Sequence, residues 1–333
     1  MHFRHLKRWS QIVILCCSAP AFGSPLFESH EPLQVELRGP LRTTVEDVDA
    51  REERSFTLAV QGTTSEVAVR VRGNNRVDVC GFPPLRLNFR TKEMDGTVFE
   101  GQDKLKLVTH CKGASGYENN VLDEYLAYRI FALLTPVSYR VRPLHITYVD
   151  SYDSATMTRF GFVIESESDV AARLEGEPFE VPSVRKSQLD SAHSALVFVF
   201  HYLIANRDWS LGRTENKESC CHNGSLVNLD GRIHVLPYDF DRSGLVNARY
   251  ANAGENTRPV RTRVYRGYCM RDLDLDAAIA AIVVREQDIL RLVDALPGSS
   301  QKDTNSRRRF LAKFFESARA GGLGRDLESD CVG

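Results

Sequence analysis

The sequence lacks an excess of charge of either sign. Lysine and arginine total 43, aspartate and glutamate total 44, and the net charge is −1. Without a positive field the chain has little attraction for a nucleic-acid backbone or an anionic membrane, so we discount nucleic acid as a partner. The rest of the composition is ordinary for a folded protein, with 42% hydrophobic and 26% charged residues. A length of 333 residues predicts about two domains, or one domain with two lobes.

The sequence also lacks an apolar stretch long enough to span a membrane. A short apolar run, residues 12–17, follows three basic residues and precedes several small ones. Cleavage after Ala21 or Gly23 would fit a secretory signal peptide over residues 1–23. A buried N-terminal helix is the alternative interpretation. We therefore expect an exported protein that is periplasmic, cell-surface or secreted, with no membrane span in the mature chain.

No two cysteines have the Cys-x-x-Cys spacing of a zinc site. Six cysteines remain after cleavage of the signal peptide: Cys80, Cys111, Cys220, Cys221, Cys269 and Cys331. An even number in an oxidising compartment favours disulfides over metal. We predict that Cys80 pairs with Cys111, because both lie at the ends of first-half strands. Cys269 is expected to pair with Cys220 or Cys221.

The chain contains no internal repeat, and its first half has the pattern of strands. Apolar and polar residues alternate there, which predicts strands at 55–60, 66–72, 85–89, 104–108, 144–149 and 160–164. Between the strands at 104–108 and 144–149, apolar residues recur at helical spacing from Asn119 until Pro136 ends the helix. Residues 24–165 are therefore expected to form a strand-rich part.

The second half, residues 166–333, has mainly the pattern of helices. Helical spacing predicts helices over 192–204, 274–296 and 303–319. Between the first two of these, Asp230-Gly231 is a two-residue turn that predicts a β-hairpin. The chain as a whole is predicted to be α+β.

Three aspartates stand in an order that suits phosphoryl transfer. Asp208 lies in the loop after an apolar helix, and the hairpin that follows leads directly to Asp239 and Asp241. Acidic groups on opposite sides of one short hairpin can converge on a single cleft. Phosphoryl transfer uses one carboxylate to orient the attacking hydroxyl and another to hold the metal that bridges the phosphates. No Gly-x-Ser-x-Gly segment is present, so an esterase has no nucleophile motif here.

Three segments resemble, in their order, the motifs of the spore-coat CotH-type atypical protein kinases. They are Arg70-Val71-Arg72-Gly73-Asn74-Asn75, Asn206-Arg207-Asp208-Trp209 and Leu236-Pro237-Tyr238-Asp239-Phe240-Asp241. That family has an R-x-R-G-N-S-like turn, a G-N-x-D loop and a P-W-D-x-D segment, and the resemblance spans about residues 66–246. It implies a two-lobed protein-kinase-like fold with a strand-rich N-lobe and a helical C-lobe. It also implies ATP with Mg²⁺ or Mn²⁺, and transfer to a protein Ser or Thr.

The resemblance implies a role for each matching residue. Asp208 matches the catalytic aspartate and Asp239 the metal-binding one, while Asp241 either assists the metal or braces the turn. Asn223 stands where the family has an asparagine that opens the hairpin, which makes it a candidate second metal ligand. Asn216 competes for that role, because kinase loops keep this asparagine closer to the catalytic aspartate.

The basic residue that contacts the phosphates is left open by the sequence. The family has Lys on the strand after its Gly-rich turn, whereas this chain has Arg86. Arginine can hold phosphate with two hydrogen bonds, but it is not equivalent to lysine. Lys106 or Lys104 on the next strand could substitute. Glu124, on the first-half helix, is the expected partner of a phosphate-contacting basic residue.

Two other functions remain open at this point. An inactive kinase-like scaffold would bind a partner or a nucleotide without transferring phosphate. The Cys220-Cys221 insertion, which lengthens the loop after Asp208, and the change from Lys to Arg86 favour that alternative. A metal-dependent hydrolase would instead use the pair formed by Asp239 and Asp241.

Overall fold

The computed structural model describes residues 24–89, 94–212, 220–252 and 258–333. The predicted signal peptide over 1–23 and the candidate ligand Asn216 lie outside the described residues. Among the helices that are described, none is both long and apolar enough to cross a membrane.

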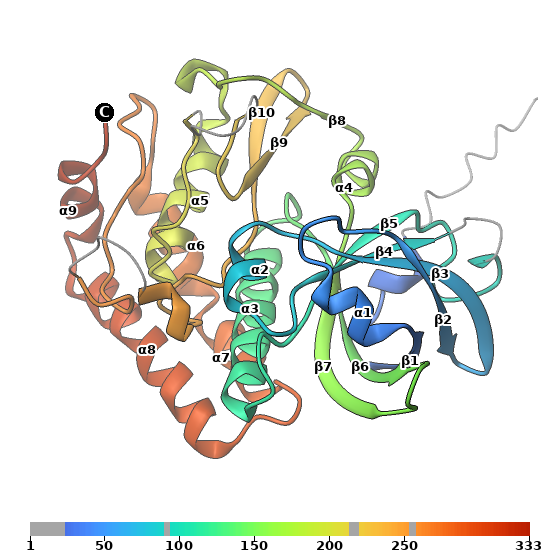
Figure 1. Ribbon diagram of the computed structural model, residues 1–333. Helices are drawn as coiled ribbons and strands as arrows, with labels where there is room; N and C mark the ends of the chain where they lie inside the picture. Colours follow the sequence, from blue (N-terminus) through green and yellow to red (C-terminus); the bar gives the residue numbers. More distant parts are fainter. Residues whose placement is uncertain (1–23, 90–93, 213–219, 253–257) are drawn as a thin grey trace, which may run out of the picture.

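Within the described part of the chain, seven strands form a closed barrel, drawn in blue to green in Figure 1. They are β1 (Leu33–Gly39), β2 (Arg54–Val60), β3 (Thr63–Val71), β4 (Leu85–Phe89), β5 (Lys104–Val108), β6 (Val141–Asp150) and β7 (Thr156–Ile164). Their order around the barrel is β1-β2-β3-β4-β5-β7-β6. The β1–β6 pair is parallel and closes the barrel, whereas the other pairs are antiparallel.

The barrel overturns the predicted two-lobed protein-kinase-like fold, which is wrong. The segment responsible is β1, whose alternation Leu33, Val35, Leu37 is buried on one face and which no strand prediction covered. It pairs with β2 on one side and with β6 on the other, so the sheet has no free edge. Alternation along a sequence predicts a half-buried strand, but it does not say which strands are neighbours.

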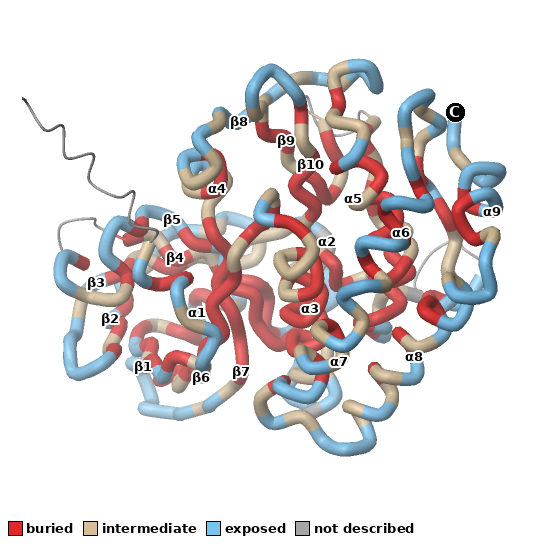
Figure 2. The backbone as a smooth tube through the Cα atoms, turned by 180° about the vertical axis from the view of Figure 1, so that it is seen from behind, coloured by how far each residue is buried: buried red, intermediate tan, exposed pale blue. Residues whose placement is uncertain are grey.

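Two hydrophobic cores lie on either side of the site described below. One fills the barrel, where Leu37, Phe56 and Tyr148 pack with Leu26 and Phe27 from the short 3-10 helix η1 (Pro25–Phe27). The other lies around α3 (Ser115–Leu134) and α5 (Ser191–Leu203), among phenylalanines and leucines that are fully buried. Figure 2 shows the buried stretches gathered inside the barrel and around these helices.

The second core is built by helices and a small sheet. The longer helices are α3 (Ser115–Leu134), α5 (Ser191–Leu203), α6 (Leu275–Val284), α7 (Glu286–Asp294) and α8 (Gln301–Ala320). The shorter ones are α4 (Glu167–Arg173), α9 (Leu323–Ser329), η3 (Lys186–Gln188) and η4 (Arg249–Asn252), whereas α1 (Leu41–Glu46) and α2 (Asn75–Val79) pack on the barrel core through Leu41 and Val77. The sheet has the order β10-β9-β8 and consists of β8 (Glu177–Pro178), β9 (Gly224–Leu229) and β10 (Arg232–Pro237). In Figure 1, α3 stands between the barrel and the helices α5, α6, α8 and α9.

Two of the predicted elements are refined by the structure. The predicted hairpin is confirmed, with Arg232 opposite Leu229 across the turn. The helix predicted over 274–296 is two helices, α6 and α7, which break at Arg285. Apolar spacing continues across a break of one residue, so periodicity alone does not locate it.

The six cysteines form three disulfides. The predicted Cys80–Cys111 bond is confirmed. The predicted partner of Cys269 is wrong, because Cys269 bonds to Cys331, while Cys220 and Cys221 bond to each other. The chain end lies beside the Cys269 segment through a bridge between Tyr268 and Val332, a proximity that cysteine spacing does not reveal.

Candidate active site

The principal cavity lies between the barrel and the helical part of the chain. It has a volume of about 750 Å³, within the range of sites for small molecules and cofactors. Its charged lining residues are the cations Arg72, Arg76, Lys106, Arg207, Arg242 and Arg266 and the carboxylates Glu124, Asp208, Asp239 and Asp241. The cations outnumber the carboxylates, so the cavity favours an anionic ligand.

Asp208 is positioned by the turn that ends α5. The side-chain oxygen of the buried Asn206 accepts a hydrogen bond from the Asp208 backbone N–H, at 3.0 Å. The Asn206 side-chain nitrogen lies 3.2 Å from Nδ1 of His201, and that imidazole stacks on Trp209 with ring centroids 4.4 Å apart. Buried packing on both sides of Asp208 therefore fixes where its carboxylate points.

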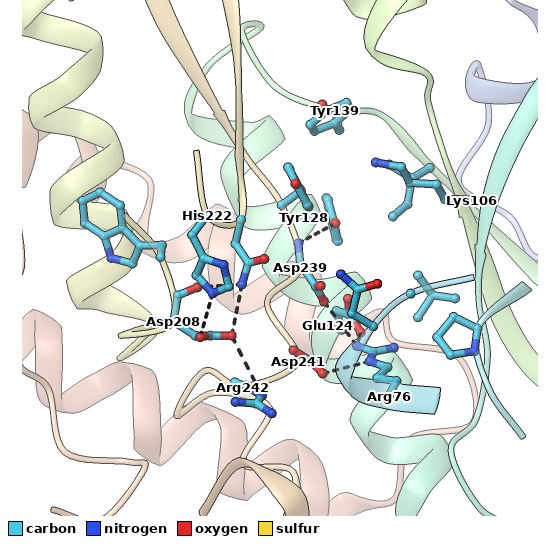
Figure 3. Close-up of a pocket in the computed structure, with 18 of the residues that line it drawn as sticks. Arg76, Lys106, Glu124, Tyr128, Tyr139, Asp208, His222, Asp239, Asp241 and Arg242 are labelled. Atoms are coloured by element: carbon cyan, nitrogen blue, oxygen red, sulfur yellow. Dashed lines mark hydrogen bonds and ion pairs between the residues drawn. The ribbon is translucent and has the colours of Figure 1, made fainter. Parts of the chain in front are cut away.

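The Asp208 carboxylate is held by three neighbours (Figure 3). His222 Nε2 donates to one oxygen at 3.0 Å, and Asn223 Nδ2 donates to the other at 3.0 Å. Arg242 Nε lies 3.9 Å from the second oxygen. Burial alone would raise the pKa of Asp208, but the hydrogen bond and charge of His222, with Arg242 and Asn223, outweigh it and hold the pKa below its usual value. Asp208 is therefore an oriented, ionised carboxylate.

Asp239 has a different environment on the same cavity. Its side chain is 43% exposed, compared with 7% for Asp241. Its backbone N–H donates to the Tyr128 hydroxyl at 3.0 Å, and its φ of 60° lies in the left-handed region. Partial desolvation and the negative charge of Asp241 raise the pKa of Asp239 to about 6, against the opposing charges of Arg76 and Arg72.

Left-handed backbone recurs around the cavity. Besides Asp239, Asn223 has a φ of 52°. Aspartate and asparagine tolerate this region better than most other residues. Such residues persist only where the surrounding structure imposes the conformation, and they cluster at functional sites.

Arg76 joins the acidic residues of the barrel side, and the sequence prediction missed it. Its guanidinium lies 2.5 Å from Glu124, 2.8 Å from Asp241 and 3.7 Å from Asp239. Burial disfavours the charge of Arg76, but these carboxylates outweigh it and raise the pKa of Arg76 further above its usual value. The sequence signal for Arg76 was its position directly after the Gly73-Asn74-Asn75 segment, where it is the second residue of the short helix α2.

Comparisons with known proteins find only distant likenesses. No protein-family model matches the chain, and no curated protein matches it significantly. Among solved structures, the proinflammatory kinase CtkA of Helicobacter pylori aligns with 13% identity and a TM-score of 0.38, covering 84% of this chain and 97% of that one. The HipA–HipB–operator DNA complex of a Shewanella oneidensis MR-1 toxin–antitoxin system aligns with 11% identity and a TM-score of 0.33, covering 74% and 65%. Scores this low assign neither a family nor an activity, and the CotH-type resemblance stays a prediction.

The structure brings most of the predicted site residues to one cavity. Asp208, Asp239, Asp241, Asn223, Glu124 and Lys106 all line it. The Asn223 side-chain nitrogen donates to Asp208, and its backbone oxygen accepts from the N–H of Tyr238, the residue before Asp239, so its role as a second metal ligand stays a prediction. Glu124 does pair with a cation, but the cation is Arg76 and not Arg86 or Lys106.

The two candidate phosphate contacts differ in where they point. Arg86 and Lys106 are cross-strand neighbours on β4 and β5, so both stand on the outer face of the barrel. Arg86 turns to Glu53, at 2.6 Å, and does not line the cavity. Lys106 lies on the barrel side of the cavity in Figure 3, with Nζ 4.7 Å from the centre of the Tyr238 ring. Lys104 is 3.3 Å from Asp103 and is also absent from the lining.

The resemblance implies a divalent metal, whose protein ligands would come from the oxygen-bearing side chains that line the cavity. The described residues contain no group of three or more His, Cys, Asp or Glu placed to hold an ion by themselves. Asp241 is engaged by Arg76 and the Asn223 amide nitrogen by Asp208, which leaves Asp239 as the carboxylate open to the cavity. Magnesium is usually held by one or two carboxylates together with water and substrate phosphates. The site therefore fits a metal that arrives with a nucleotide, and not one held by protein ligands alone.

Proposed function

We propose that this protein is a phosphotransferase that moves the terminal phosphoryl group of metal-bound ATP to a Ser or Thr of a protein. The observation that carries the proposal is the pair of carboxylates on one cavity. Asp208 is oriented and ionised, whereas Asp239 is exposed to the cavity. These are the two properties that transfer needs, because one carboxylate must receive the hydroxyl and the other must face the phosphates.

Each residue has a defined part in the proposed reaction. Asp208 accepts the proton of the acceptor hydroxyl while the oxygen of that hydroxyl forms a bond to the terminal phosphorus of ATP. The bond from that phosphorus to the bridging oxygen breaks, and ADP leaves. His222 and Asn223 keep the Asp208 carboxylate in one orientation. A bound Mg²⁺ would neutralise phosphate charge, and Asp239 is the residue that would hold it.

The barrel side of the cavity supplies cations for the phosphates. Lys106 and Arg72 both line the cavity there. Arg72 forms no ion pair with a described carboxylate, although the charge of Asp239 acts on it. Arg76 serves differently, because its charge is already matched by Glu124 and Asp241. We assign it to holding the Asp239 segment against α3.

The contacts in the cavity also bear on the two alternative functions, a metal-dependent hydrolase and an inactive scaffold. A metal-dependent hydrolase would need the Asp239–Asp241 pair, but the Asp241 carboxylate is engaged by Arg76 at 2.8 Å. An inactive scaffold would bind nucleotide in the same cavity without transfer. A measurement of nucleotide binding together with a measurement of transfer distinguishes the scaffold from the enzyme.

Thermal unfolding with nucleotide tests the role of Asp239. We expect ATP with Mg²⁺ to stabilise the protein by about 2.7 kcal/mol at a ligand concentration near 100 times Kd. Asp239→Asn keeps the side-chain shape but loses the charge that would hold the metal. The variant should therefore lose the part of the stabilisation that depends on Mg²⁺.

Asp49→Asn is the matched control, since Asp49 is exposed and does not line the cavity. It should respond to ATP and Mg²⁺ as the natural protein does. Equal stabilisation of Asp239→Asn and the natural protein would show that Asp239 does not hold the metal. If no nucleotide stabilises the natural protein, the proposal that it binds a nucleotide is wrong.

We further propose that the protein is exported, on the strength of the signal-peptide pattern over 1–23. The mature chain should begin near Phe22 or Ser24. Cleavage before Ser24 would leave the barrel core whole, because Leu26 and Phe27 pack in it. N-terminal sequencing of protein secreted by its natural host checks this, and a mature chain that begins at Met1 would contradict it.

A further inference from the structure

Three arginines gather on the Asp208 side of the cavity. Arg207 precedes Asp208 in the chain, Arg242 lies 3.9 Å from its carboxylate, and Arg266 comes from the segment that leads to Cys269. All three line the cavity. Burial lowers the pKa of Arg207, and the positive charges of Arg258 and Arg266 lower it further, which places these cations close together.

Within the described residues, this arginine group has fewer carboxylate partners than positive charges. Among the described carboxylates, only Asp208 forms an ion pair with any of the three, and it does so with Arg242. Arg207 instead donates to the backbone oxygens of Arg258 and Pro259, at 3.2 and 3.4 Å. Arg76 on the barrel side contrasts with them, because three carboxylates surround it. The Asp208 side therefore carries the cavity's excess of positive charge.

The segment that carries Arg266 is fixed beside the Asp208 loop. The Leu211 backbone N–H donates to the Tyr268 hydroxyl at 3.0 Å, and the Trp209 and Tyr268 rings meet edge to face. The Cys269–Cys331 disulfide follows directly. The backbone that carries Arg266 is thus held beside the Asp208 loop before a ligand arrives, which lowers the entropy that binding costs.

We infer that the acceptor is an acidic polypeptide segment, whose carboxylates next to the Ser or Thr are bound by Arg207 and Arg266. The inference rests on the proposed function, because it takes Asp208 as the residue that receives the acceptor hydroxyl. An acceptor whose hydroxyl lies at Asp208 must place its flanking residues around that side chain. Arg207 is its neighbour in the chain, and Arg266 shares the same part of the cavity wall. Arginine forms strong, directional hydrogen bonds with carboxylates, which suits such a role.

The nucleotide phosphates are assigned to the other side of the cavity. Asp239, the carboxylate open to a metal, lies near Arg76 and Arg72 on the barrel side. Lys106 is on that side too (Figure 3). The phosphates of a metal-bound nucleotide would therefore be matched by cations other than Arg207 and Arg266.

Steady-state phosphorylation of two matched peptides tests the inference. Both carry one Ser, flanked by Glu in the first and by Gln in the second. We expect the natural protein to prefer the acidic peptide, and Arg266→Gln to raise its KM by about fivefold with kcat and the KM for ATP unchanged. Arg266→Glu should reverse the preference toward a Lys-flanked peptide. Arg271→Gln is the matched control, because Arg271 is exposed in the same segment and lines a different cavity.

A binding measurement keeps this inference separate from the proposed function. Anisotropy of the labelled acidic peptide, without nucleotide, should show binding that Arg266→Gln and added salt both weaken. If the peptide binds in this way but no peptide is phosphorylated, the acidic partner stands and the phosphotransferase fails. If both peptides are phosphorylated equally, the phosphotransferase stands and the acidic acceptor fails. An Arg266→Gln variant that loses ATP affinity instead would assign these arginines to the nucleotide and overturn the inference.

Discussion

Replacing Asp208 by asparagine should lower the rate of phosphoryl transfer by about 10²–10⁴-fold, the usual contribution of a general base. The substitution preserves the shape of the side chain, but the neutral amide loses the ion pair with Arg242 and cannot take the proton of the acceptor hydroxyl. Nucleotide binding should be unchanged, because the proposed function places the acceptor at Asp208 and the phosphates at Asp239. The rate is measured as phosphate incorporated into an acceptor, and binding by thermal shift with ATP and Mg²⁺.

Comparison with Asp239→Asn shows whether the loss of transfer in Asp208→Asn comes from the missing base or from weaker nucleotide binding. Both variants should lose transfer, but only Asp239→Asn should lose the Mg²⁺-dependent part of nucleotide binding. Thermal unfolding without ligand confirms that each variant is folded, and Asp49→Asn again serves as the control. Transfer that persists in Asp208→Asn would rule out its proposed role, and loss of nucleotide binding in that variant would place Asp208 with the phosphates.

Replacing Arg76 by methionine should lower the free energy of unfolding by about 3–5 kcal/mol, the cost of breaking a buried ion pair by removing one partner. The side chains of Glu124 and Asp241 are 3% and 7% exposed, so neither carboxylate would be compensated by water. Burial already raises the pKa of Glu124, against the opposing charge of Arg76. Urea denaturation at neutral pH measures the loss.

The pH dependence of this variant follows from the direction of that shift. A carboxyl group whose folded pKa lies above its unfolded pKa destabilises the protein as pH rises, because the folded state must give up its proton. Without Arg76 the pKa of Glu124 rises further, so the loss of stability should be larger at high pH than at low pH. The double variant Arg76→Met/Glu124→Gln should recover part of the loss. A single variant as stable as the natural protein would show that the Arg76 contacts contribute nothing.

The order of elements that the sequence predicts around Asp208 and Asp239 is the order that the structure shows. A helix that ends before Asp208, a hairpin and then Asp239 could be expected from periodicity and from one Asp-Gly turn, because these are local signals. The two ends of the hairpin lie together, and the bridge between Ser210 and His222 brings the loop after Asp208 back to the start of the hairpin. This is why Asp208 and Asp239 reach the same cavity.

The partners of these residues could not be predicted in the same way. The family resemblance implied that Glu124 would meet the basic residue that contacts the phosphates, with Arg86, Lys106 and Lys104 as the candidates. Arg86 is instead drawn to Glu53 on the outer wall of the barrel, and Arg76 reaches Glu124 from α2. Arg76 and Glu124 are 48 residues apart, and no local pattern relates them.

The sequence by itself determined the local elements: the alternating strands, the apolar helix before Asp208, the hairpin and the Cys80–Cys111 pair. Each follows from spacing within a short stretch or from the ends of elements so placed. The tertiary structure decided that β1 closes a barrel, that Cys269 meets Cys331, and that Arg76 rather than a strand residue neutralises Glu124. The physical reason is that pairing between distant segments is selected by the burial of whole faces and the matching of buried charges. Those quantities exist only once the chain is folded.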